Sequence, residues 1–525
     1  MKKKKFITII FIIIILRIII SCNLPSFYIK NMYYDDNYMV EQAKNIIKGN
    51  YLGTYNDKTL IKGLVFPFFI AFCKMLNISY TFSVTIIYIV GCSLLTYALK
   101  NNIKNKKLLL LTYILLLFNP ISYSSDAFQR LYRNSLSASL ILFFFSFLIN
   151  IINSKNNKSN IINSLCLGII TSIMFLTRED NIWCIITILL LIIYKLKQKK
   201  NLKSFLINII PFCILFLNLN IISLINYKYY NIYTYNELEK SNFKNAYIKI
   251  QEIKSEHKYN TVSITKNDLI KLANKSKKFK ITSQEIDVMY REWADPNTQE
   301  INNGNMIWAL RKLIYKKHQF SSGKEANQYF YELSEEIELL FQNKELEKEI
   351  IIPSVFINTP TIKHIKQLPK NIINTIIYTT KYKNIKTLEK KEFNKLKIIN
   401  DKEINTNAIY INDYHNTENI VNNNPIVISI IKKIYYLFSV IFSIISVINM
   451  VFSINKNNKN KIIIYLILIS YTMIIAGVAY TETTAFKSIR YFYLVYIYIL
   501  QTIFIILNLN EINFKKNTKK ILAKR

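Results

Sequence analysis

Hydrophobic segments of near-bilayer length recur in two blocks of this chain, one before residue 226 and one after residue 425. A helix needs about 20 predominantly apolar residues to cross the hydrocarbon core of a bilayer. The repeated pattern therefore predicts a polytopic α-helical membrane protein with about ten transmembrane helices. Their approximate positions are 6–22, 79–99, 108–121, 135–152, 160–176, 181–195, 203–225, 427–454, 462–480 and 491–508.

The basic residues of the chain are concentrated in the short segments that join these spans. Residues 227–425 carry 31 Lys or Arg and 24 Asp or Glu, whereas the rest of the chain carries 38 basic and 9 acidic residues. Cytoplasmic loops of membrane proteins are enriched in Lys and Arg in this way. The distribution accounts for the net charge of +36 without a nucleic-acid partner. It predicts a multi-pass protein of the cytoplasmic (inner) membrane, in contact with its lipids and with both termini in the cytoplasm.

A soluble insert divides the spans into two groups. The run 64–76 is too short to cross a bilayer, so we expect a helix that lies along the outer surface. All six cysteines lie in or beside hydrophobic segments, which excludes a disulfide-stapled outer domain. The predicted N-terminal membrane domain covers 1–225 and contains spans 1–7, an acidic outer loop at 23–62 and the surface helix at 64–76. An extracytoplasmic insert follows at 226–425. Spans 8–10 lie at 426–510, and a basic cytoplasmic tail ends the sequence at 511–525.

We expect the insert to be mainly α-helical, with a mixed α+β domain as the alternative. One helix of the insert is indicated at 305–317. The Tyr-rich opening at 226–235 is interpreted as strand or loop. The clearest helix is indicated by apolar residues at helical spacing, namely Ala326, Tyr329, Leu333, Ile337 and Leu340.

Two adjacent carboxylates, Asp35 and Asp36, follow the first span directly. An amphipathic helix comes next and ends at Gly49, so one of them could cap its N-terminus. Alternatively, Asp35 could act as a general base. Close to a membrane and beside a second carboxylate, its pKa is expected to rise towards a useful value. The pair could also hold a divalent cation such as Mg²⁺ or Mn²⁺.

Several charged residues are predicted at the outer ends of other segments. Arginine binds phosphate through two parallel hydrogen bonds, and lysine binds it as a point charge. Each cation alone could be an interfacial anchor. Gathered around two carboxylates, they would suit a lipid-phosphate leaving group. These residues are Lys62 before the surface helix, Arg130 and Arg133 before span 4, Arg178 and Glu179 between spans 5 and 6, and Arg490 before span 10.

With these motifs in this order, the sequence resembles the GT-C membrane glycosyltransferases, which use polyprenyl-phosphate-linked sugars and include protein O-mannosyltransferases and lipid A aminoarabinose transferases. The resemblance covers about 1–225 and 426–510. Its elements are Arg17 in the first span, Asp35-Asp36, the helix ending at Gly49, Lys62 to Pro67, Thr177-Arg178-Glu179 and Arg490-Tyr491. The family's acidic pair is usually Asp-Glu, and its basic-Pro-Pro entry is here Lys62-Gly63-Leu64. Which acid is the base, and how substrate is held, therefore stay open.

The resemblance implies an inverting transfer of a sugar from a polyprenyl-phosphate donor to a glycan, lipid or protein acceptor at the outer face. Asp35 would be the general base, and Asp36 would orient it or bind a metal. The binding residues would stabilise the charge of the departing lipid phosphate. These are Lys62, Arg178 and Arg490, with Arg130, Arg133 and Glu179 beside them.

Two other classes of protein share some of these features. Surface-polysaccharide (O-antigen-type) polymerases and ligases also have many spans and a large outer loop, but they depend more on loop Arg and His residues. A non-enzymatic transporter or scaffold is the third class. Transporters often show repeated halves, whereas the two halves of this chain are unlike each other.

Overall fold

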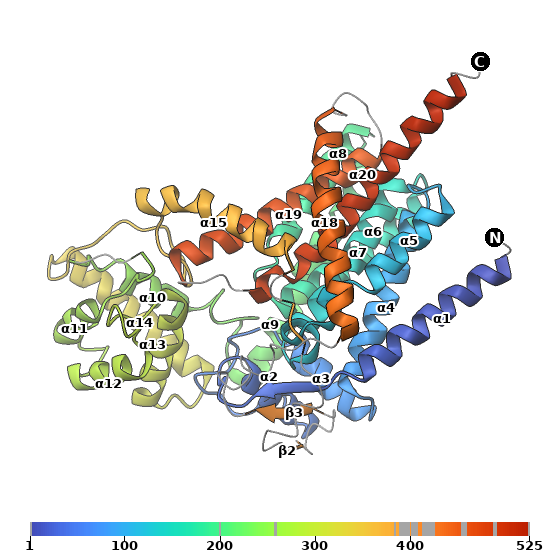
Figure 1. Cartoon of the computed structure of the whole chain (residues 1–525). Coiled ribbons are helices and arrows are strands. Elements are labelled where there is room, and N and C mark those ends of the chain that lie inside the picture. The colour runs from blue at the N-terminus through green and yellow to red at the C-terminus, as the bar shows by residue number, and fades with distance from the viewer. Residues whose placement is uncertain are drawn as a thin grey trace.

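The computed structural model of the chain is largely α-helical (Figure 1). It describes residues 3–198, 201–256, 260–382, 385–387, 399–400, 408–411, 426–452, 459–486 and 491–522. Within these ranges, five helices are long and apolar enough to cross a membrane, which is the helix content of a multi-pass membrane protein. They are Tyr80–Leu99, Asn134–Asn153, Asn157–Thr177, Leu202–Tyr230 and Asn460–Thr484.

Helices occupy all the segments before residue 226 where the hydrophobic pattern predicts them. Several begin at a Ser or Asn whose side chain accepts a hydrogen bond from the first turn, such as Ser79 and Asn105. The predicted surface helix is α3. The elements are α1 Lys3–Cys22, β1 Ser26–Ile29, α2 Asp36–Ile47, α3 Val65–Met75, α4 Tyr80–Leu99, α5 Lys106–Leu117, η1 Pro120–Tyr123, η2 Ser125–Gln129, α6 Asn134–Asn153, α7 Asn157–Thr177, α8 Trp183–Gln198 and α9 Leu202–Tyr230.

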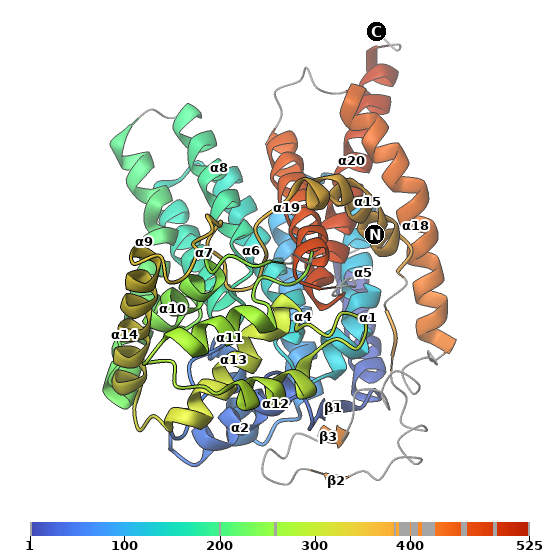
Figure 2. The same ribbon diagram turned by 90° about the vertical axis from the view of Figure 1, so that its left-hand side faces the viewer.

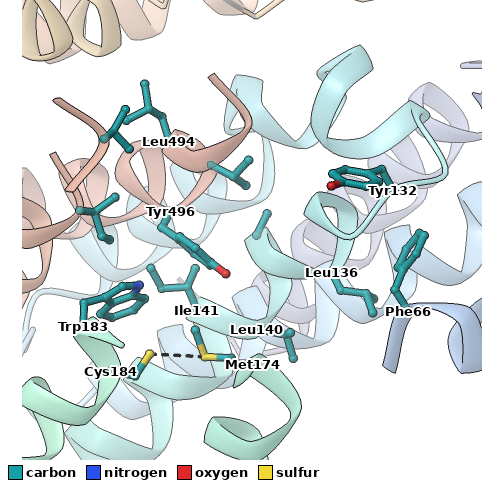
Figure 3. Close-up of a cluster of buried hydrophobic side chains, with 14 of the residues drawn as sticks. Phe66, Tyr132, Leu136, Leu140, Ile141, Met174, Trp183, Cys184, Leu494 and Tyr496 are labelled. Carbon is teal, nitrogen blue, oxygen red and sulfur yellow. Dashed lines mark hydrogen bonds between the residues drawn. The ribbon is translucent and has the colours of Figure 1, made fainter. Parts of the chain in front are cut away.

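Helix α6 is the centre of the bundle. In its most apolar stretch, 83% of the residues are buried. The corresponding share in α9 is 22%, so α9 lies at the periphery. Small buried residues such as Ser135, Ala138 and Ser139 allow neighbouring helices to approach α6 closely. Figure 3 shows the layer of buried side chains around α6, with Trp183 of α8 packed edge-on against Tyr496 at a centroid distance of 5.5 Å.

The insert is built mainly of helices, as predicted. Helices α13 and α14 confirm the two predicted helical segments, and α14 buries the predicted apolar face except for Tyr329, which is half-buried. The interpretation of 226–235 as strand or loop is wrong for its first half, because α9 continues to Tyr230 and ends at Asn231, which has a left-handed φ of 57°. The helices are α10 Asn242–Gln251, α11 Lys266–Lys275, α12 Ser283–Trp293, α13 Asn303–His318, α14 Gly323–Gln342 and α15 Ile362–Thr380.

One short strand of the insert pairs with the N-terminal region, and a second strand of the insert pairs with the first. Strand β3 (Ala408–Ile411) runs parallel to β1, and β2 (Ile399–Asn400) runs antiparallel to β3. The small sheet lies beside α2 (Figure 1). It therefore joins the end of the insert to the segment that carries Asp35 and Asp36.

The C-terminal helices return to the bundle and pack against α5, α6 and α8. In Figure 1 both termini lie on the right-hand side of the bundle, whereas helices α10 to α14 lie on the left, and Figure 2 shows these insert helices facing the viewer. The C-terminal elements are α18 Ile426–Phe452, α19 Lys459–Thr484, η3 Tyr491–Leu494 and α20 Val495–Leu522.

Candidate active site

Asp36 is a buried structural carboxylate at the start of α2. Its side chain is 0% exposed, and its two oxygens accept hydrogen bonds from Arg130 Nε at 2.9 and 2.8 Å. The backbone N–H of Ile29 donates to Oδ2 at 2.9 Å. Arg130 in turn lies beside β1, because Leu131 N donates to Phe27 O at 2.7 Å. The Asp36–Arg130 pair therefore ties β1, α2 and the segment before α6 together.

Asp35 occupies the N-cap position of α2, yet the capping interpretation is wrong for its side chain. Among the described residues it makes no capping hydrogen bond. Its Oδ1 instead pairs with Lys62 and accepts a hydrogen bond from the Tyr132 hydroxyl at 2.8 Å. The side chain is 38% exposed, and in the described part of the chain no hydrogen bond falls on Oδ2. Asp35 thus combines a partly exposed side chain with one carboxylate oxygen that accepts no hydrogen bond from the described residues, as a proton acceptor requires.

The expected rise in the pKa of Asp35 is wrong. Burial raises it, but the charges of Lys62 and Arg130, together with hydrogen bonds from Lys62 and Tyr132, hold the pKa of Asp35 well below its usual range. Burial raises the pKa of Asp36 against the opposing charge of Arg130. Since the cations next to Asp35 outweigh its desolvation, this carboxylate is ionised at neutral pH.

Tyr132 is a member of the site that sequence reasoning missed. The centre of its ring lies 5.5 Å from Lys62 Nζ, 5.1 Å from Arg130 Cζ and 5.5 Å from Arg133 Cζ. It is one of 37 tyrosines, so its residue type carries no signal. Its place between two arginines in the sequence could have drawn attention to it. Its ring face and hydroxyl connect three predicted cations to Asp35.

Glu179 joins a second part of the site. Its Oε2 pairs with Arg133 Nη1 at 2.9 Å, and its Oε1 accepts hydrogen bonds from Gly63 N at 2.8 Å and Asn236 Nδ2 at 3.0 Å. Through Gly63 it holds the backbone next to Lys62. Glu179 therefore connects the turn between α7 and α8 to the loop before α3 and to the beginning of the insert.

Arg178 has different partners from the other predicted cations. It forms a bidentate pair with Asp180, with Nε and Nη2 at 2.9 and 2.7 Å from its oxygens, and also donates to Asn134. Its guanidinium lies 4.7 Å from the centre of the Tyr493 ring, so it connects the α7–α8 turn to η3. Asp180 was not among the predicted site residues. Arg490 lies outside the described residues.

The acidic pair is a poor fit for a divalent cation. Both oxygens of Asp36 are engaged by Arg130 and Ile29, and Oδ1 of Asp35 is engaged by Lys62 and Tyr132. Within the described ranges no group of three or more His, Cys, Asp or Glu residues is placed to hold a metal ion. Three of the four carboxylate oxygens are therefore already engaged by protein donors, and Oδ2 of Asp35 alone supplies too few ligands for a hard cation.

Gly63 is required by a close backbone approach. A Cβ atom at this position would lie 1.9 Å from Leu176 O. We expect Gly63→Ala to lower the free energy of unfolding by about 1–3 kcal/mol, because the α7 backbone would have to move. Thermal unfolding of the purified protein measures this. Gly477→Ala is the control, because no described heavy atom beyond its chain neighbours and the backbone of its own helix lies within 4 Å of its Cβ position. An unchanged unfolding temperature for Gly63→Ala would contradict the prediction.

The chain was compared with protein-family models, with curated proteins and with solved structures, and no match was found in any of the three.

Proposed function

We propose that this protein is a membrane glycosyltransferase that moves a sugar from a polyprenyl-phosphate donor to a glycan, lipid or protein acceptor at the extracytoplasmic face. The observation that carries the proposal is the partly exposed carboxylate of Asp35, held by Lys62 and Tyr132 just beyond the first apolar helix. The order of the motifs, which resembles that of the GT-C enzymes, supports it. A general base beside a cation suits the proton transfer and the departing phosphate of such a reaction.

In the proposed reaction, Oδ2 of Asp35 accepts the proton of the acceptor hydroxyl or amine. The acceptor atom then forms a bond to the anomeric carbon, and the bond from that carbon to the phosphate oxygen breaks with inversion. The polyprenyl phosphate leaves with the electron pair. When the donor phosphate draws Lys62 towards itself, Asp35 loses part of its counter-charge, so its pKa rises and it becomes a stronger base.

The surrounding ion pairs have different roles in this proposal. Arg130 is buried against Asp36 and positions the acidic segment rather than contacting phosphate. Arg133 pairs with Glu179 and lies against the Tyr132 ring, so its charge adjoins the open side of Asp35. Lys62 and Arg133 are therefore the described cations that we assign to the donor phosphate, with Arg178 and Glu179 supporting the adjacent turn.

The proposal includes the finer topology: ten spans, with the insert outside and the loop between α6 and α7 in the cytoplasm. Asn343 in the insert and Lys155 in that loop are both exposed. In a variant without the six native cysteines, we expect a membrane-impermeant maleimide applied to intact cells to label Asn343→Cys but not Lys155→Cys. Labelling of both after permeabilisation is the control. The reverse pattern would contradict the assigned orientation.

The function is tested by incubating the purified protein in proteoliposomes with a panel of radiolabelled polyprenyl-phosphate sugars and with membrane extracts as acceptors. Transfer of single sugars with release of polyprenyl phosphate supports the proposal. Processive lengthening or en bloc transfer of a lipid-linked polysaccharide would instead indicate the polymerase or ligase. Transfer of no sugar from any donor in the panel would favour the transporter or scaffold.

A further inference from the structure

The insert brings a group of aromatic side chains to the segment that carries Asp35. Tyr34, the residue before Asp35, stacks on Trp308 of α13 with a centroid distance of 5.3 Å and an interplanar angle of 27°. Trp293, at the end of α12, lies 6.1 Å from Tyr34 in a tilted arrangement. All three rings are only partly buried. We call these three residues the aromatic platform.

The aromatic platform adjoins the charged site directly. Lys62 Nζ lies 5.4 Å from the centre of the Trp308 ring. The same amine donates to the backbone carbonyl of Tyr34 and pairs with Asp35. The aromatic faces and the candidate base are therefore separated by a single lysine side chain.

A buried network holds the insert in this position. Arg311 of α13 and Glu237 form an ion pair at 2.5 Å, and both are almost fully buried. Arg311 Nε donates to Asp57 O at 2.6 Å, and the Tyr34 hydroxyl donates to Asp57 Oδ2 at 2.7 Å. Because the loop before Lys62 is fastened to α13 in this way, the platform and the charged site form one preorganised unit.

We infer that the aromatic platform of Tyr34, Trp293 and Trp308 contacts a pyranose ring of the acceptor, so that the acceptor of the proposed transfer is a glycan and the insert is part of its binding site. This inference rests on the proposed function. A pyranose has an apolar C–H face that suits an aromatic ring and hydroxyl groups that suit Lys62 and Asp35. A lipid chain has no polar groups that could bind Lys62 or Asp35. Trp293 and Trp308 belong to the insert, whereas the cations assigned to the donor phosphate, Lys62 and Arg133, lie before α3 and α6.

The tryptophan content of the chain allows a direct binding test. The chain has three tryptophans, of which Trp183 is buried against Phe144 of α6 and the other two belong to the platform. The protein carrying Trp183→Phe, in lipid nanodiscs, is titrated with methyl glycosides of glucose, mannose, galactose and N-acetylglucosamine. We expect a saturable change in tryptophan emission with at least one of them. The change should be lost when Trp308→Leu is added, since leucine preserves apolar packing but not the ring.

A kinetic measurement separates the inference from the proposed function. Trp308→Leu is expected to raise the acceptor KM about tenfold, which corresponds to about 1.4 kcal/mol of lost stacking, and to change the donor KM much less. If Trp308→Leu transfers sugar with an unchanged acceptor KM, the aromatic platform does not bind the acceptor, and the proposed glycosyltransferase activity is retained. The protein could instead show a saturable emission change that depends on Trp308 but no transfer activity. That result would support a sugar-binding site and contradict the proposed glycosyltransferase function. No emission change with any glycoside would overturn the inference.

Discussion

Asp35→Asn is expected to reduce sugar transfer by about 10³-fold, within the range that general-base catalysis supplies. The amide is nearly the same size as the carboxylate and can still accept hydrogen bonds from Lys62 and Tyr132, so the fold should be retained. It cannot accept the proton of the acceptor. The measurement is the initial rate of transfer from a labelled polyprenyl-phosphate sugar in membrane vesicles that contain matched amounts of protein.

Glu41→Gln is the matched control for this experiment. Glu41 lies on α2, close in sequence to Asp35, and its side chain is 57% exposed with a weak pair to Lys44 at 3.6 Å. The same acid-to-amide change should leave transfer unaffected there. If Asp35→Asn is fully active, Asp35 is not the general base, and the polymerase or ligase hypothesis is favoured. Equal losses in both variants would point to a general charge effect rather than to catalysis.

Arg130→Met is expected to lower the free energy of unfolding by about 3–5 kcal/mol, because it leaves a carboxylate buried without its counter-ion. Asp36 is 0% exposed and has Arg130 Nη2 at 2.7 Å from Oδ1. Methionine fills much of the space of the arginine stem but supplies neither charge nor hydrogen bonds. A lower midpoint of thermal unfolding in detergent, compared with the wild-type protein under the same conditions, is the measurement.

Two further variants show whether the buried charge is the cause. Adding Asp36→Leu to Arg130→Met removes the uncompensated carboxylate, so most of the loss should be recovered. Lys254→Met removes one partner of an exposed pair, with Glu347 at 2.7 Å, and should change the midpoint little. If Arg130→Met unfolds at the wild-type temperature, the pair does not hold β1, α2 and the α6 entrance together.

The helical segments were predictable because their signal is local. A continuous apolar run specifies a helix within its own length, so the predicted spans coincide with helices from α1 to α20, and the apolar spacing of the insert identifies α13 and α14. Gly49, with a φ of +79°, follows α2 as predicted. The prediction of strand or loop is wrong at 226–230, because α9 continues beyond its apolar stretch to Tyr230.

The site was predictable in part. The sequence indicated that Asp35 and Asp36 meet cations from distant segments, and the structure pairs them with Lys62 and Arg130, which lie 27 and 94 residues away along the chain. It did not indicate which aspartate is open and which is buried. Nor did it indicate Tyr132, Asp180 or the platform tryptophans, because such partners depend on which side chains come together across α6 and the insert.

By itself, then, the sequence determined that this is a chain of apolar helices with a helical insert, since helix formation and burial in lipid depend on residues close together in the chain. The tertiary structure alone decided the chemistry of the acidic pair. Two identical side chains in succession acquire opposite environments, one facing Lys62 and Tyr132 with an open oxygen and the other enclosed by Arg130 and Ile29. Their pKa values shift in opposite directions because desolvation and neighbouring charge are properties of the assembled fold.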